Sequence, residues 1–242
     1  MAKSKPLKGT QKQKAEPVIG KCIYCGQVRE LDRDHVPPEN LFPKPRPSNL
    51  VTVPSCRVCN KRFSSDDEYF RTALSLTLDP AQDPRLQQIV DKALRSFKRP
   101  ESVGLTRTFF NTFQNVNLRG PSGLYYGKAT TYTVDLVRIR RTCNRIVRGL
   151  YYKEMGHRLP TDAFTHTEVV RPITDPKILD ENLENIQVVV NQPAKAIGMN
   201  LFFYKYVIAG DEPLASIWLL NFYHKILVLG LTVPNQPLPP RD

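Results

Sequence analysis

The sequence predicts an α+β fold, in which a compact N-terminal module held together by cysteines precedes a larger mixed α+β domain. Two C-x-x-C pairs bracket short strand-like segments that run into a helix. The chain continues with helical periodicity, then with a segment that begins as a strand and turns into a helix, and finally with three strand-like segments near the C-terminus. At 242 residues the chain is long enough to bury a full core.

These patterns divide the chain into four parts. Residues 1–17 are lysine-rich and contain one acid, so we expect a disordered tail that is either simply solvated or grips phosphate without reading sequence. Residues 18–78 form the N-terminal module, and residues 79–100 form a connecting helix. Residues 101–242 form the α+β domain, which we expect to recognise a substrate, a ligand or a partner protein.

The composition favours a polyanionic partner. The net charge is +12 and the pI is about 9.6, so nucleic acid is the first expectation and an anionic membrane surface the second. The sequence has no apolar run near the ~20 residues that span a bilayer, and its start lacks the apolar core of a secretory signal. We therefore expect no membrane partner and a cytoplasmic location, in a prokaryotic or phage-infected cell.

Four of the five cysteines have the spacing of metal ligands. Cys22 and Cys25 form one C-x-x-C pair, and Cys56 and Cys59 form the other. The two-residue gap lets a tight turn direct both sulfurs of a pair at one ion, and two such pairs typically complete one tetrahedral Zn²⁺ site. Because four thiolates leave no open coordination position, this zinc would be structural and would do no chemistry.

The segments between and after the cysteines predict the order strand, strand, helix. Residues 31–36 are expected to form a short strand, and the Pro-rich loop that follows cannot continue it. Residues 49–54 are β-branched and short, as expected for a second strand. The second C-x-x-C pair then opens a helix, with Ser65 as the N-cap of a restart and Glu68 as its partner in a capping box.

Four polar residues lie at the ends of the expected strands and at the start of the expected helix. Asp34 and His35 end the first strand, Asn49 opens the second, and Asn60 directly follows the last cysteine. The ordered pattern C-x-x-C … D-H-V-P-P … N-L … C-x-x-C-N resembles the HNH endonucleases, whose fold is a ββα-metal finger, over about residues 20–75. The resemblance implies His35 as the general base, and Asp34 with Asn60 as protein ligands of one catalytic Mg²⁺ or Mn²⁺. It places Asn49 where it would bond backbone across the loop and orient His35.

The residue types suit this chemistry. Histidine can be neutral at cellular pH and take a proton from water, and Asp and Asn offer the hard oxygen ligands that Mg²⁺ and Mn²⁺ prefer. The third motif position is Asn60 and not histidine, so Asp66 and Asp67 are rival ligands. The asparagines have an alternative as capping or turn residues, and the two aspartates as charges that favour a helix N-terminus.

The resemblance implies a phosphodiester hydrolase that acts on nucleic acid, with DNA as the expected substrate. One finger carries one active centre, so cutting both strands needs a homodimer or two successive cleavage events by one molecule. Two alternatives stay open: a zinc-binding nucleic-acid-binding protein without catalysis, and a nuclease subunit that acts only in a complex formed through residues 101–242. The arginines between residues 138 and 148 are not confined to one stripe, so we expect a solvated helix face, with a phosphate-facing surface as the alternative.

Overall fold

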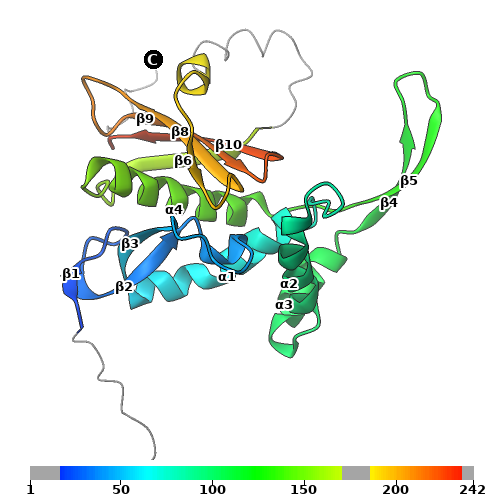
Figure 1. The fold of residues 1–242 in the computed structure, drawn as a ribbon, viewed down its shortest axis with the longest axis horizontal. Coiled ribbons are helices and arrows are strands. Elements are labelled where there is room, and N and C mark those ends of the chain that lie inside the picture. The colour runs from blue at the N-terminus through cyan, green and yellow to red at the C-terminus, as the bar shows by residue number, and fades with distance from the viewer. Residues whose placement is uncertain (1–16, 171–185, 236–242) are drawn as a thin grey trace, which may run out of the picture.

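The computed structural model describes residues 17–170 and 186–235, which form a mixed α+β fold as predicted (Figure 1). The basic tail predicted at residues 1–17 lies outside the described residues, apart from its last residue. The helices and strands are, in chain order, β1 (Ile19–Lys21), β2 (Val28–Val36), β3 (Val51–Cys56), α1 (Arg57–Ser75), α2 (Gln87–Phe97), α3 (Val103–Phe110), β4 (Gln114–Arg119), β5 (Tyr125–Thr131), α4 (Leu136–Met155), β6 (Phe164–Val169), β7 (Lys195–Ile197), β8 (Phe202–Ile208), β9 (Ser216–Phe222) and β10 (Ile226–Val233).

The N-terminal module is a three-stranded antiparallel sheet that leads directly into a helix. Its strand order is β1-β2-β3, and the β2–β3 pairing runs from Leu31 opposite Cys56 to Val36 opposite Val51. Cys56 ends β3 and is also the residue before the first turn of α1. The predicted order of strand, strand and helix is therefore observed.

The predicted helix restart at Ser65 is wrong. α1 runs without interruption from Arg57 to Ser75, so Ser65 lies in its middle. No glycine or proline interrupts this segment. α1 also packs against α4, and this tertiary packing supports polar turns whose own helix propensity is weak.

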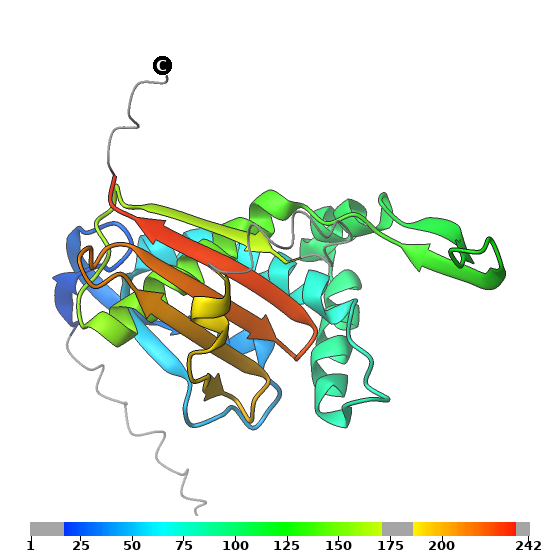
Figure 2. The same cartoon turned by 90° about the horizontal axis from the view of Figure 1, so that it is seen from above.

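The C-terminal half forms a five-stranded antiparallel sheet in the order β6-β10-β9-β8-β7 (Figure 2). The three strands predicted near the C-terminus are confirmed as β8, β9 and β10. Aromatic side chains of the inner strands β8 and β9 fill the core, among them Phe202, Tyr204, Trp218 and Phe222. The sheet thus buries one aromatic face against the rest of the protein.

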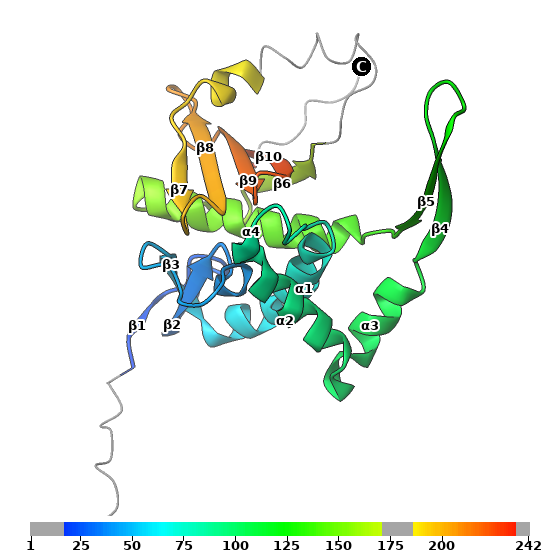
Figure 3. The same ribbon diagram turned by 45° about the vertical axis from the view of Figure 1, so that its right-hand side comes forward.

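Helix α4 forms the layer between the N-terminal module and this sheet (Figures 1 and 3). One hydrophobic core runs through all three layers and includes Val36 of β2, Ile146 of α4 and Trp218 of β9. Asp135 caps the start of α4 by accepting two backbone N–H groups, and Gly156 ends it with a φ of 74°. The two halves of the sequence therefore share one core.

The polar side of α4 carries charged residues, as its amphipathic sequence predicts. Its apolar positions are buried, including Ile139, Cys143 and Leu150. Neither α4 nor any other helix in the described ranges is long and apolar enough to cross a membrane.

Residues 79–131 form two helices, whose Ile89 and Phe109 belong to the main core, and a hairpin. The predicted connecting helix is present as α2, and the short helix α3 follows it. Strands β4 and β5 then pair as a two-stranded hairpin that extends away from the three layers (Figures 1 and 3). The hairpin is not predicted by the sequence, because its residues are largely exposed and lack the apolar alternation that marks a half-buried strand.

We predict that Gly149→Ala lowers the free energy of unfolding by about 1 kcal/mol. A Cβ on Gly149 of α4 would lie 2.6 Å from Cγ2 of Val36, which is fixed on β2. Overpacking of this kind costs about 1–3 kcal/mol, which exceeds the ~1 kcal/mol that alanine gains over glycine within a helix. Urea denaturation measures the difference.

Gly104→Ala in α3 is the matched control, since a Cβ there meets no atom within 4 Å. We expect this control to keep or slightly raise stability. Equal loss in both variants would contradict the close contact between α4 and β2.

Candidate functional site

The four predicted ligand cysteines form one cluster. Their sulfur atoms all lie within 4.8 Å of one another, and Sγ of Cys25 is 3.8 Å from Sγ of Cys56. Four sulfurs at ~2.3 Å from a tetrahedral Zn²⁺ lie ~3.8 Å apart, so the spacing suits a single ion of this kind. Three of the cysteines are buried and Cys25 is half-buried. The structure thus confirms that the four cysteines are placed to hold a metal ion.

Two tight segments bring the cysteines together. In the turn after β1, Gly26 has a φ of 71° and donates its N–H to the carbonyl of Cys22 at 2.9 Å. The N–H of Ile23 donates to the carbonyl of Pro54 at 3.1 Å, which fastens this turn to β3. The second cysteine pair lies where β3 passes into α1. The cluster therefore closes the module at the end opposite to the β2–β3 loop.

Three of the predicted catalytic residues, Asp34, His35 and Asn60, line one pocket of about 320 Å³. We call it the acidic pocket; its remaining lining residues are Arg33, Pro38, Glu39, Asn40 and Asp67. The pocket lies where β2 ends beside the first turn of α1. Residues from two separate segments of the sequence thus meet at one place.

Asp34 and His35 both line the pocket although they are neighbours on β2, paired regularly opposite Val53 and Thr52 of β3, and successive residues of a strand point to opposite faces. Asp34 is buried and His35 is half-buried. Asn60 and Asp67 are seven residues apart on α1, which places them on one helix face. Of the two rival aspartates, only Asp67 lines the pocket.

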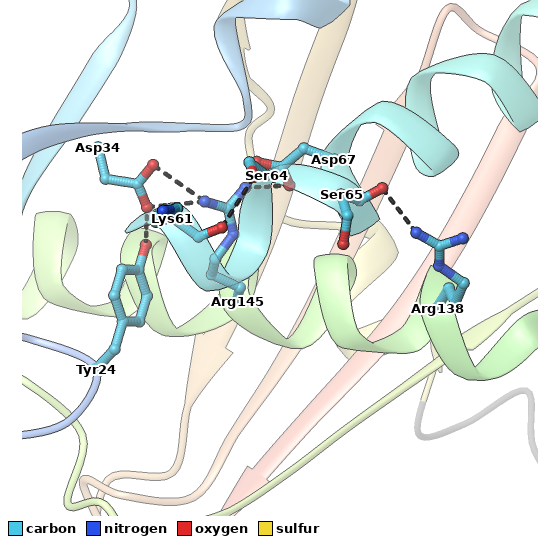
Figure 4. Close-up of polar contacts among 8 residues, drawn as sticks. All are labelled: Tyr24, Asp34, Lys61, Ser64, Ser65, Asp67, Arg138 and Arg145. Atoms are coloured by element: carbon cyan, nitrogen blue, oxygen red, sulfur yellow. Dashed lines mark hydrogen bonds and ion pairs between the residues drawn. The ribbon is translucent and has the colours of Figure 1, made fainter. Parts of the chain in front are cut away.

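Arg145 of α4 holds two carboxylates of the acidic pocket (Figure 4). Its Nη1 donates to both carboxylate oxygens of Asp34, at 3.0 and 2.9 Å. Its Nη2 donates to Oδ1 of Asp67 at 2.5 Å. The hydroxyl of Tyr24 donates to Oδ2 of Asp34 at 2.8 Å. This buried network joins the turn after β1, strand β2, helix α1 and helix α4.

The charges of the network do not cancel, because one guanidinium faces two carboxylates. Burial lowers the pKa of Arg145, but the charges of Asp34 and Asp67 outweigh this, so its pKa is raised and it stays charged. Burial raises the pKa of Asp67 to about 6 against the opposing effect of Arg145, and the like charge of Asp34 adds to the rise. A cation in the acidic pocket would compensate the remaining negative charge.

Arg145 and Tyr24 are site residues that the motif does not include. The predicted solvated face of α4 is wrong for Arg138 and Arg145, which pair with acids of the N-terminal module, whereas Arg141 is exposed. Arg138, Arg141, Arg145 and Arg148 recur at intervals of three, four and three residues, which defines one face of a helix. Part of this face meets α1: Arg138 Nε donates to Oδ1 of Asp66 at 2.7 Å, and the nearly fully buried Arg145 bonds Asp67. The spacing of these four arginines is the sequence signal that could have identified this face.

Asn49 does not line the acidic pocket, and its predicted role requires a correction. Its side-chain oxygen accepts the N–H of Gly198 at 3.1 Å, and its side-chain nitrogen donates to the carbonyl of Ala196 at 3.2 Å. Both bonds are to backbone, as expected, but they lead to β7 and the turn after it. Within the described ranges no hydrogen bond joins Asn49 to His35. The α4 layer brings the β7 edge beside this loop, a contact with no local sequence signal.

The chain matches no protein-family model, no curated protein and no solved structure. Its functional interpretation therefore depends on the cysteine cluster, on the acidic pocket and on the contact between them. That contact is made by Tyr24, which lies between Cys22 and Cys25 in the chain and bonds Asp34.

We predict that Asn49→Ala destabilises the contact between the N-terminal module and β7. The substitution removes two hydrogen bonds to backbone at a largely exposed position, so we expect a loss of about 1 kcal/mol. Hydrogen exchange at the β7 amides, with urea denaturation alongside, measures it. Asn117→Ala is the control, because Asn117 is exposed on the hairpin. Unchanged exchange at β7 would show that Asn49 does not secure this edge.

Proposed function

We propose that this protein is a metal-dependent nuclease of the HNH type, which hydrolyses phosphodiester bonds in nucleic acid. The observation that supports this most directly is that Asp34, His35 and Asn60 line one pocket. These are three of the four residues that the resemblance assigns to catalysis, and they come from two segments. The order of strand, strand and helix and the four-cysteine cluster complete the same pattern.

In this proposal His35 takes a proton from the attacking water, since its half-buried ring lines the pocket. Asp34 and Asn60 each offer an oxygen to a divalent cation, and Asp67 offers a third. Asp34 keeps room for this role: a carboxylate has about four acceptor sites, and Arg145 and Tyr24 make three contacts to it. A bound Mg²⁺ or Mn²⁺ would supply charge stabilisation at the phosphate and the leaving oxygen.

We assign Zn²⁺ to the cysteine cluster, as a structural ion. All four ligands are sulfur and their spacing fits a tetrahedron, so the site is closed to substrate. Its contribution is to hold the turn after β1 against the β3–α1 junction. The same turn carries Tyr24, whose hydroxyl bonds Asp34.

Nucleic acid is the substrate class in this proposal, with DNA as the expected form. The net charge of +12 suits a polyanion. Arginines of α4 line a second pocket beside α1, and one of them, Arg145, bonds Asp34 and Asp67 of the acidic pocket, so positive charge lies next to the proposed site of cleavage.

One observation favours a second candidate, a zinc-stapled nucleic-acid-binding protein without catalysis. Arg145 already occupies Asp34 and Asp67 with three hydrogen bonds, and a guanidinium in this place does part of what a cation would do. Under this alternative the protein binds nucleic acid normally but shows no cleavage that depends on Mg²⁺ or Mn²⁺. The His35 experiment below separates the two candidates.

We predict one tightly bound Zn²⁺ per chain and loss of the folded N-terminal module when it is removed. Cys56→Ser deletes one of the four thiolates, and the free energy of metal binding at such a site is folding free energy. Elemental analysis measures the stoichiometry, and hydrogen exchange over residues 20–75 reports the folding. Cys143→Ala is the control: Cys143 is buried in α4, away from the cluster, so this variant should keep its zinc. Purified protein without zinc would refute the assignment.

We predict that His35→Ala lowers the rate of Mg²⁺- or Mn²⁺-dependent plasmid nicking by at least ~10²-fold, the effect of losing a positioned general base. Affinity for the same DNA, measured by anisotropy without added cation, should stay unchanged. His157→Ala is the matched control, because this exposed histidine does not line the acidic pocket. Nicking at a normal rate in His35→Ala would refute the mechanism, and wild-type binding without nicking would favour the second candidate.

A further inference from the structure

A second pocket lies beside α1 on a different face from the acidic pocket. Its volume is about 470 Å³, and four arginines line it: Arg62 of α1 and Arg141, Arg145 and Arg148 of α4. Arg62 lies two residues after Asn60, which turns it by ~200° around the helix. We call this the arginine pocket. Arg145 lines it while its Nη atoms bond the carboxylates of the acidic pocket, so one side chain borders both.

Most of the positive charge in the arginine pocket has no acidic partner. Asp66 is its one acidic lining residue among those described. That carboxylate is held by Arg138 at 2.7 Å, whereas the exposed Arg141 lies 4.0 Å from it. Among the residues described, no carboxylate lies within 4.0 Å of Arg62 or Arg148. Three guanidinium charges therefore face the pocket with little neutralisation.

Two of the four arginines, Arg145 and Arg148, are also held in place. Arg148 donates to the carbonyls of Leu159, Pro160 and Ala163 and to the hydroxyl of Thr165. These acceptors are neutral, so they fix the side chain without cancelling its charge. Arg145 is 3% exposed, and its Nε has no hydrogen-bond partner in the part of the chain that is described. Arg145 and Arg148 therefore contribute fixed positive charge beside the pocket.

We propose that the arginine pocket binds a phosphate ester group, as carried by a nucleic-acid strand or by a free nucleotide. Guanidinium groups recognise phosphate through paired N–H donors. Arg62 and Arg141 make no hydrogen bond among the described residues, so their donors are free, whereas the Nη donors of Arg148 are already used and this side chain contributes only its charge. If the phosphate belongs to a strand, the pocket positions that strand beside α1, with the acidic pocket on the other face. That version rests on the proposed nuclease function, whereas the phosphate chemistry itself does not.

The test uses the full-length protein without added Mg²⁺ or Mn²⁺, so that no cleavage occurs. The variant carries Arg62→Gln and Arg141→Gln, both at exposed positions where the fold is not at risk. The matched control carries Arg107→Gln and Arg119→Gln, which change the net charge equally on α3 and the hairpin, and both are exposed. Two probes are titrated at constant ionic strength: a labelled oligonucleotide by anisotropy, and deoxyadenosine monophosphate against uncharged deoxyadenosine by calorimetry.

We expect the pocket variant to bind the oligonucleotide at least ~10-fold more weakly, and its log affinity to fall less steeply with log salt by ~1–2, because each lost phosphate contact contributes about 0.9 to the slope. The control should change by less than ~3-fold. If only the oligonucleotide responds, the phosphate belongs to a strand. If the monophosphate binds, deoxyadenosine does not, and the pocket variant alone loses this binding, the pocket takes a free phosphate ester.

If the pocket variant and the control lose affinity for the oligonucleotide equally, the proposal is overturned, because the loss would then reflect only the change in net charge. The outcome is independent of the His35 experiment. Arginine-dependent binding without any cleavage removes the nuclease proposal and leaves the phosphate pocket standing. Cleavage that depends on His35, with no difference between the two arginine variants, removes the phosphate pocket and leaves the nuclease proposal standing.

Discussion

The buried ion network of Arg145 sets where the layers of this protein lie. Its guanidinium reaches from α4 to Asp34 on β2 and to Asp67 on α1, and little of it is exposed. Burying a guanidinium costs several kcal/mol unless it is fully paired, and removing one partner of a buried pair typically costs about 3–5 kcal/mol. A sliding motion of α4 along the module would unpair these charges, so the network holds the helix in register with the module.

This constraint makes the N-terminal module part of a larger unit. The boundary at residue 78 marks a change in sequence pattern, but the hydrophobic core continues from Val36 of β2 through α4 to Trp218. Without α4, the module would expose an apolar face and leave Asp34 and Asp67 without their guanidinium. The ββα order is therefore recognisable locally, whereas its charge balance is completed by a helix encoded about 80 residues later.

Whether a feature could be predicted from the sequence depends on how far apart along the chain its contacting residues lie. The cysteine cluster, the end of β2 and the start of α1 each have signals within a few residues. The prediction for Cys22 follows from C-x-x-C spacing, and those for Asp34 and Asn60 follow from the resemblance to the HNH endonucleases, whose motif lies within this short segment. The partners of Asn49 and of Asp34 lie 147 and 111 residues away, and no local pattern specifies them. The spacing of the arginines of α4 indicates one helix face, yet only the structure shows that Arg138 and Arg145 of this face pair with acids of the N-terminal module.

Tyr24 connects the cysteine cluster to the acidic pocket. It lies between two cysteines of the cluster, and its buried hydroxyl bonds the same carboxylate that Arg145 holds. Stripping the cluster would release this turn and withdraw one donor from Asp34, even if the acidic pocket had held no metal. Under the proposed function, loss of activity with a chelator would therefore not identify the responsible ion. Dialysis that leaves a metal in the cysteine cluster, followed by return of Mg²⁺ or Mn²⁺ alone, would distinguish a structural effect from a catalytic one.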